Sequence, residues 1–203
     1  MEVNMIEQFI KSYWNYYLEL EQQFIETKRY VEFGTSNNRT YSVEYLKLYQ
    51  AVCSEIDVVG KEIAQVVNPT FRVDEHTNIP KWGFQVQQQF GFIKDTCVRF
   101  NGDISLQPFK NWEYEQYTDK NNCVRLRIVG GGRNVIKWWK NYNAVKHQRI
   151  GLITNTKNYI LANQENLVLA FAALFLLEKL FLDWRIDEEN YTDPIANSLL
   201  FNL

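Results

Sequence analysis

The chain has 203 residues, a net charge of −2 at pH 7 and 46% hydrophobic residues, which is enough to bury the core of one globular domain. Three cysteines lie far apart without a CxxC pair, which argues against a disulfide framework and a zinc site, and we expect no metal and no cofactor. The longest apolar run, residues 167–177, is well short of the roughly 20 residues that cross a bilayer, and the first residues contain no apolar signal core. These features predict a cytoplasmic protein with no membrane contact.

The first half of the chain is predicted to be helical, because apolar residues recur there at three- and four-residue steps. A first helix is expected over residues 3–31. A second is expected over residues 43–67, because Ser42 can serve as its N-cap and Asn68-Pro69 stops it. A third helix is expected from about Pro80 to Val98, since proline fits the first turn of a helix.

The periodicity changes after residue 100. Short strands are expected over residues 104–109 and 123–129, followed by a fourth helix over 134–150 and a very apolar fifth helix over 157–184. The acidic tail beyond the fifth helix either docks on the protein or stays mobile. The predicted fold is therefore mainly α, a single domain over residues 1–203. It consists of about five helices in a bundle, with a small β-hairpin-like insertion at about residues 100–132, before helix four.

Charge is distributed unevenly along the chain. Residues 120–164, the basic segment, contain nine Lys and Arg and no Asp or Glu, so all 24 acidic residues lie elsewhere. A basic segment on an acidic protein is typical of a polyanion-binding surface, and RNA is the expected partner. The alternative is an intramolecular match with the acidic N- and C-terminal parts. The candidate nucleic-acid-binding residues are Arg125, Arg127, Arg133, Lys137 and Lys146.

The predicted fourth helix contains His147, one of only two histidines. At about 100° per residue, His147 shares a face with Ile136, Lys140 and Asn143, whereas the opposite side carries apolar residues that can enter the core. Those apolar residues are Trp138, Tyr142 and Val145. A neighbouring ammonium group favours the neutral imidazole, which suits a general base, and cations nearby would hold a phosphate. Alternatively, His147 is one more solvated side chain of a basic surface.

The segment Tyr142-Asn143-Ala144-Val145-Lys146-His147, followed by a long apolar helix, resembles the HEPN superfamily of helical-bundle proteins. The HEPN motif is an Arg, a polar residue that is often Asn or Asp, three variable residues and a His. Asn143 and His147 match the polar residue and the His, whereas Tyr142 stands in place of the motif Arg.

The resemblance implies a metal-independent endoribonuclease of a phage-defence, abortive-infection or toxin–antitoxin system, in which two copies of the motif meet across a dimer. It implies His147 as the proton-transfer group and Asn143 as a positioning group. Another cation must then supply the charge of the missing Arg, and the candidates are Lys140, Lys146 and Arg149. The alternative is a non-catalytic relative that binds nucleic acid or a protein partner, such as a phage-encoded inhibitor. A third hypothesis is a purely structural interaction protein.

Three further expectations concern neighbouring residues. Glu55 or Asp57 can face His147 and orient its imidazole, or can simply be a solvated or paired acid. Asp74-Glu75-His76 can contact a metal, although three adjacent loop residues seldom have the required geometry. Aromatic residues within and beside the basic segment, such as Trp112, Tyr117 and Trp139, can stack on bases or pack in the core.

A homodimer is also expected, with helix four or five at its interface. The fifth helix carries Leu, Phe and Ala on nearly every side, which is more than one intramolecular face requires.

Overall fold

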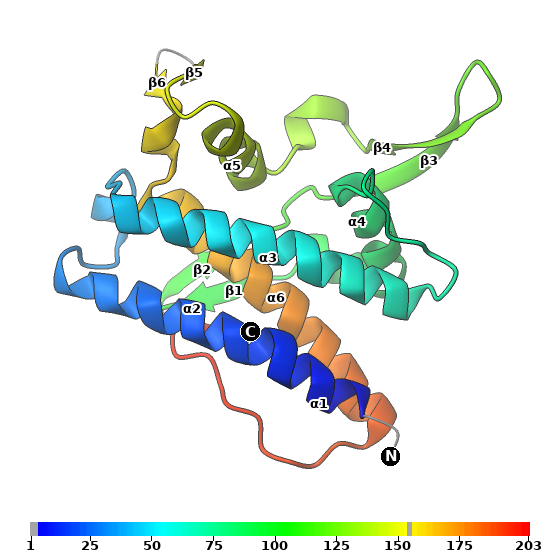
Figure 1. The fold of residues 1–203 in the computed structure, drawn as a ribbon, viewed down its shortest axis with the longest axis horizontal. Coiled ribbons are helices and arrows are strands. Elements are labelled where there is room, and N and C mark those ends of the chain that lie inside the picture. Colours follow the sequence, from blue (N-terminus) through cyan, green and yellow to red (C-terminus); the bar gives the residue numbers. More distant parts are fainter. Residues whose placement is uncertain (1–3, 154–155) are drawn as a thin grey trace.

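Five long helical stretches form a bundle in the computed structural model of this protein (Figure 1). The model describes residues 4–153 and 156–203, without the side chains of residues 133, 134, 153 and 156. The first stretch is continuous from α1 through a π-helical segment, η1, into α2. The helices are α1 (Met5–Phe9), η1 (Ile10–Trp14), α2 (Asn15–Glu26), α3 (Val43–Val67), α4 (Ile79–Gln89), α5 (Lys137–His147) and α6 (Gln164–Glu189). The predicted mainly helical class is confirmed, and none of the described helices is long and apolar enough to cross a bilayer.

Short 3₁₀ turns and strands connect these helices. The 3₁₀ turns are η2 (Thr27–Arg29), η3 (Thr35–Asn37), η4 (Gly91–Lys94), η5 (Gly131–Asn134) and η6 (Asn158–Leu161). The strands are β1 (Val98–Phe100), β2 (Ile104–Leu106), β3 (Tyr114–Thr118), β4 (Val124–Ile128), β5 (Leu152–Ile153), β6 (Thr156–Lys157) and β7 (Phe201–Asn202). All the strand pairs are antiparallel, in a three-stranded sheet β2-β1-β7 and two hairpins, β3-β4 and β5-β6. The β3–β4 hairpin extends away from the bundle (Figure 1).

Three sequence expectations differ from this arrangement. The fifth helix begins at Gln164 and ends at Glu189, because residues 157–161 belong to β6 and η6 instead. The strands predicted over 104–109 and 123–129 correspond to β2 and β4, but they belong to different sheets, because each pairs with a strand that was not predicted. The third helix ends at Gln89 rather than Val98, since the backbone of Phe90 leaves the helical region. Val98 and Phe100 are instead buried on one face of β1, with Arg99 exposed between them.

Helix α6 is the centre of the core. Its residues from Leu167 to Leu182 are almost all buried, and it contacts α1, α2, α3, α5 and β1 within the same chain. Figure 1 shows α6 crossing α3 and the α1–α2 helix. Its apolar sides are therefore covered intramolecularly, so the reason for expecting a dimer through this helix does not hold.

The segment after α6 docks along the first helix rather than hanging free (Figure 1). Glu21 of α2, which is 1% exposed, accepts hydrogen bonds from the hydroxyls of Tyr17 and Ser198 and from the backbone N–H groups of Leu199 and Leu200. The strand β7 then pairs with β1 and places the Phe201 ring in the core. One buried carboxylate thus holds the C-terminal segment in place.

Candidate nucleic-acid interface

Helix α5, which carries His147, is fixed to the rest of the protein by three hydrogen bonds, to α3, to the segment before β3 and to α6. The Tyr49 hydroxyl of α3 donates to the backbone carbonyl of Trp138. The Trp138 indole Nε1 donates to the carbonyl of Pro108 at 2.9 Å, and the Asn141 amide donates to Asn166 of α6 at 3.1 Å. These bonds determine which side of α5 faces solvent.

The buried side of α5 is the predicted one, because Trp138, Tyr142 and Val145 all lie in the core. Tyr142 is 5% exposed, and its ring meets the Tyr49 ring edge-on at 5.9 Å. Tyr142, which stands in place of the Arg in the resemblance to the HEPN motif, is therefore a packing residue.

The other side of α5 presents Lys140, Asn143 and His147. Lys140 and His147 are exposed and Asn143 is partly exposed, and none of these three side chains forms a hydrogen bond or ion pair with the described residues. Arg149 lies just beyond the helix, where its guanidinium donates to Gln50 of α3 at 3.4 Å. The structure thus brings Lys140, Asn143 and His147 to one face and places Arg149 at the end of the helix.

Neither Glu55 nor Asp57 pairs with His147, and of the two interpretations of these acids the paired one holds for Asp57. Asp57 instead accepts hydrogen bonds from the Lys61 ammonium at 2.6 Å and from the Trp82 indole Nε1 at 2.9 Å. Glu55 is half-buried on a different side of α3, and desolvation raises the pKa of its carboxyl. The imidazole of His147 therefore has no acidic partner among the described residues.

A polar pocket of about 300 Å³ opens beside this face, between α3, α4 and α5. Its polar lining is Ser54 and Asp57 from α3, Thr77 and Asn78 before α4, and Asn143 and Lys146 from α5. The rings of Trp139 and Tyr142 complete the α5 wall. Of the residues proposed from the sequence, Asn143 and Lys146 line the pocket, whereas Lys140, His147 and Arg149 do not.

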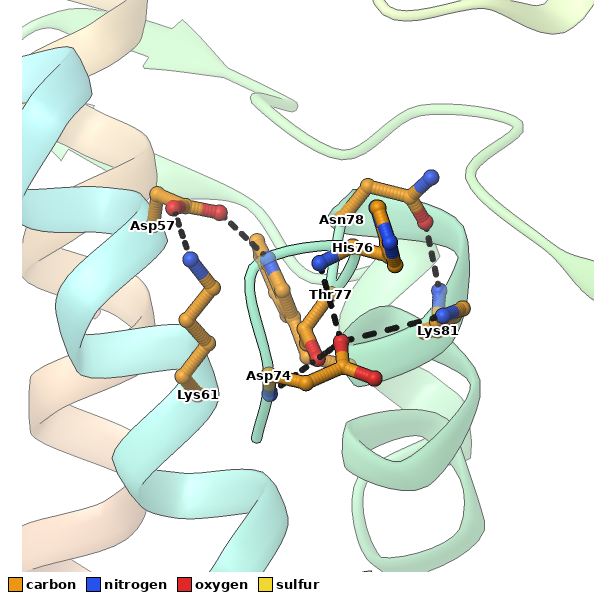
Figure 2. Close-up of polar contacts among 8 residues, drawn as sticks. Asp57, Lys61, Asp74, His76, Thr77, Asn78 and Lys81 are labelled. Carbon is orange, nitrogen blue, oxygen red and sulfur yellow. Dashed lines mark hydrogen bonds and ion pairs between the residues drawn. The ribbon is translucent and has the colours of Figure 1, made fainter. Parts of the chain in front are cut away.

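Asp57, which lines the pocket, is held by close packing of α3 against α4. Gly60 makes this approach feasible, because a Cβ at that position would lie 2.6 Å from the Trp82 ring. The Trp82 indole can then reach Asp57 across the two helices, while Lys61 neutralises the same carboxylate (Figure 2). Both oxygens of Asp57 are thereby occupied.

The loop before α4 is held by its own polar groups. Asp74 accepts hydrogen bonds from the backbone N–H of His76 at 3.0 Å and from the Thr77 hydroxyl at 2.8 Å, and Asn78 caps the helix by accepting from the Lys81 N–H (Figure 2). The Thr77 hydrogen bond, together with nearby Lys81, lowers the pKa of the Asp74 carboxyl. Asp74 serves as a turn-forming group here, and no cluster of His, Cys, Asp and Glu in the described residues is arranged to hold a metal.

The basic segment carries less unpaired charge than its sequence indicates. Arg125 pairs with Asp119, Arg127 with Glu115 at 2.7 Å, and Lys137 with Glu165 at 3.5 Å. These acids lie just outside the segment in sequence and not in the N- or C-terminal parts of the chain, as the intramolecular alternative required. Within the basic segment, the cations without a carboxylate partner among the described residues are Lys120, Lys140, Lys146, Arg149 and Lys157, whereas the side chain of Arg133 lies outside the described residues.

Comparison with known proteins adds no relative. No family model matches this chain, and no curated protein or solved structure matches it either.

Sequence reasoning missed three pocket residues, Ser54, Thr77 and Asn78, and left Trp139 undecided between stacking and packing. The only local signal was Asn78 before Ile79-Pro80, which is typical of a helix N-cap and so of an exposed helix start. Trp112 and Trp138 are core residues, whereas the Trp139 ring is partly exposed at the pocket.

Proposed function

We propose that this protein binds RNA through α5, with Lys140, Lys146 and Arg149 contacting phosphates. The observation that carries the proposal is that these exposed cations lie around one helix and have no acidic partner among the described residues. Unpaired surface cations release counterions when they meet a phosphate backbone, and this release supplies most of the sequence-independent affinity for nucleic acid.

The framework of the proposal is a HEPN-like domain over residues 1–203. In it the β3–β4 hairpin is an insertion before α5, and Asn143 and His147 are the motif residues that remain. The burial of Tyr142 favours RNA binding over RNA cleavage. In the HEPN motif an arginine at this position acts on the phosphate, and a side chain buried in the core cannot reach a phosphate.

Removing the Lys140 charge should weaken RNA binding and flatten its salt dependence. For a single-stranded RNA, the slope of log K against log salt becomes shallower by about 0.7 for each phosphate that the protein no longer neutralises. We expect Lys140→Ala to show that reduction in fluorescence anisotropy titrations of a 12-nucleotide oligouridylate at several salt concentrations. Lys11→Ala, which removes an exposed lysine of η1 distant in sequence from α5, is the matched control and should leave the slope unchanged. Equal slopes for both variants would contradict the role of α5.

Cleavage of RNA is a second candidate function, favoured by the alignment of Lys140, Asn143 and His147 on one exposed face. In this mechanism His147 takes the proton from the attacking 2′-hydroxyl, and Lys140 stabilises the charge that develops on the phosphate. The bond from the 2′-oxygen to phosphorus replaces the bond from phosphorus to the 5′-oxygen of the next nucleotide. The products are a 2′,3′-cyclic phosphate and a 5′-hydroxyl, which takes the proton back from the His147 imidazolium.

If the protein cleaves RNA, His147→Ala should lower the cleavage rate by about 100- to 10,000-fold, the usual contribution of a positioned proton-transfer group. The melting temperature should hardly change, because the exposed imidazole packs in no core. His76→Ala is the control, since it removes the other histidine from an exposed loop. A wild-type protein that cuts no RNA between pH 5 and 9 would exclude this candidate and leave RNA binding in place.

A further inference from the structure

The pocket between α3, α4 and α5 differs in chemistry from the cationic surface around it. We propose that it is a base-binding subsite, which takes one unpaired base of the single-stranded RNA whose phosphates lie along α5. This inference rests on the proposed RNA-binding function and adds to it a contact with the bases themselves.

The charge of the pocket gives a phosphate little to bind inside it. Its charged lining is one ammonium, Lys146, and one carboxylate, Asp57, whose charge is already balanced by Lys61 at 2.6 Å. Lys146 is therefore the one cation of the lining without a carboxylate partner among the described residues, and it is exposed. Phosphates suit Lys146 and the other exposed cations of α5, whereas a neutral ring with polar edges suits the polar and aromatic interior.

The hydrogen-bonding groups of the pocket suit the edge of a base. The Asn143 amide offers donors and an acceptor on one plane, and it forms no hydrogen bond with the described residues. The Ser54 hydroxyl is likewise without a partner among them. The Asp57 oxygens, in contrast, are already used by Lys61 and Trp82. Asparagine pairs with the edges of bases through such a two-point contact, which a phosphate cannot make.

The apolar part of the pocket suits the face of a base. Trp139 is partly exposed, its ring lines the pocket beside Tyr142, and the two ring centroids are 5.0 Å apart. Aromatic side chains stack on any base, because every base has a π-face. The volume of about 300 Å³ lies at the lower end of the range for ligand pockets, which leaves room for one ring system and not for a longer ligand.

The position of Asn143 connects the pocket to the proposed phosphate contacts. At about 100° per residue, Trp139 and Lys146 lie on the pocket side of α5, and Lys140 and His147 lie on its exposed side. Asn143 lies between these two pairs. A strand whose backbone follows Lys140 and Lys146 can therefore direct one base past Asn143 into the pocket.

The test compares three proteins and two strands. The proteins are the wild type, Asn143→Ala and Lys140→Ala; the strands are a 12-nucleotide oligouridylate and an abasic ribose-phosphate strand of the same length. We expect Asn143→Ala to weaken binding of the oligouridylate about 10-fold and to leave binding of the abasic strand unchanged. Lys140→Ala, the matched control on the same helix, should weaken binding of both strands, and equal melting temperatures show that both variants fold.

The outcomes separate the two proposals. If the wild type binds RNA and Asn143→Ala binds the oligouridylate equally well, or loses affinity for both strands alike, the base subsite is excluded and RNA binding stands. If the wild type binds neither strand at low salt, the proposed function fails and the subsite fails with it.

Discussion

Replacing Glu21 by alanine should lower the free energy of unfolding by about 3 kcal/mol, and the melting temperature by about 10 °C. The buried carboxylate accepts four hydrogen bonds, two of them from the backbone N–H groups of Leu199 and Leu200. Hydrogen bonds to a charged group are stronger than neutral ones, and the buried Leu200 N–H would be left without an acceptor. Urea denaturation measures the loss directly.

The matched control is Glu19→Ala, because Glu19 lies on the same helix but is exposed and bonds only to Gln23. Glu21→Gln keeps one acceptor oxygen and should fall between the wild type and Glu21→Ala. Hydrogen exchange should show that protection is lost first over residues 198–202. An unchanged free energy of unfolding in Glu21→Ala would mean that the hydrogen bonds of Glu21 contribute nothing to stability.

Replacing Glu178 by glutamine should stabilise the protein, and increasingly so as the pH rises. Glu178 lies in the middle of α6, is fully buried, and neither of its oxygens has a hydrogen-bond partner among the described residues. Burial, and secondarily the charge of Glu55, raises the pKa of this carboxyl well above its ordinary value. The folded state therefore holds the proton more tightly than the unfolded state does.

The direction of the pH effect follows from that difference. The contribution to stability is fully present below the unfolded pKa of about 4.3 and is lost as the pH rises through the folded pKa, at about 1.4 kcal/mol for each pH unit. Glu178→Gln removes this loss while keeping a neutral side chain of similar size. The two proteins should thus be nearly equal in stability at pH 4 and diverge by more than about 1.4 kcal/mol at pH 8.

Chemical denaturation at several pH values checks this result, with the exposed Glu188→Gln on the same helix as the control. Other titrating groups contribute equally to both profiles, so the difference isolates Glu178. Parallel stability profiles for the wild type and Glu178→Gln from pH 4 to 8 would show that this carboxyl does not keep its proton in the folded protein.

Local signals in the sequence are sufficient for several elements. The sequence predicts the second helix over residues 43–67, and α3 has those bounds, because Ser42 accepts from the Tyr45 N–H and Asn68-Pro69 follows. Helical periodicity alone likewise predicts the buried side of α5 correctly. Capping and periodicity involve residues within a few positions of each other, so the sequence reports them directly.

Tertiary structure decided the features that join distant segments. The pairing of β1 with β7 and the docking of the tail were not predictable, since their partners lie far apart in the sequence. Glu21, for example, bonds to residues 177 to 179 positions later. Helix α6 shows the same limit, because its apolar sides indicate a dimer in the sequence but are covered by the bundle in the fold.

The candidate site combines both kinds of information. Lys140, Asn143 and His147 could be placed on one face from the sequence, because all three lie on one helix. The pocket could not, because it forms only where α3, the start of α4 and α5 meet, and that meeting depends on Gly60 admitting Trp82 and on Tyr49 reaching the Trp138 carbonyl. Spacing along one element determines which residues share a face, whereas packing between elements determines what that face lies against.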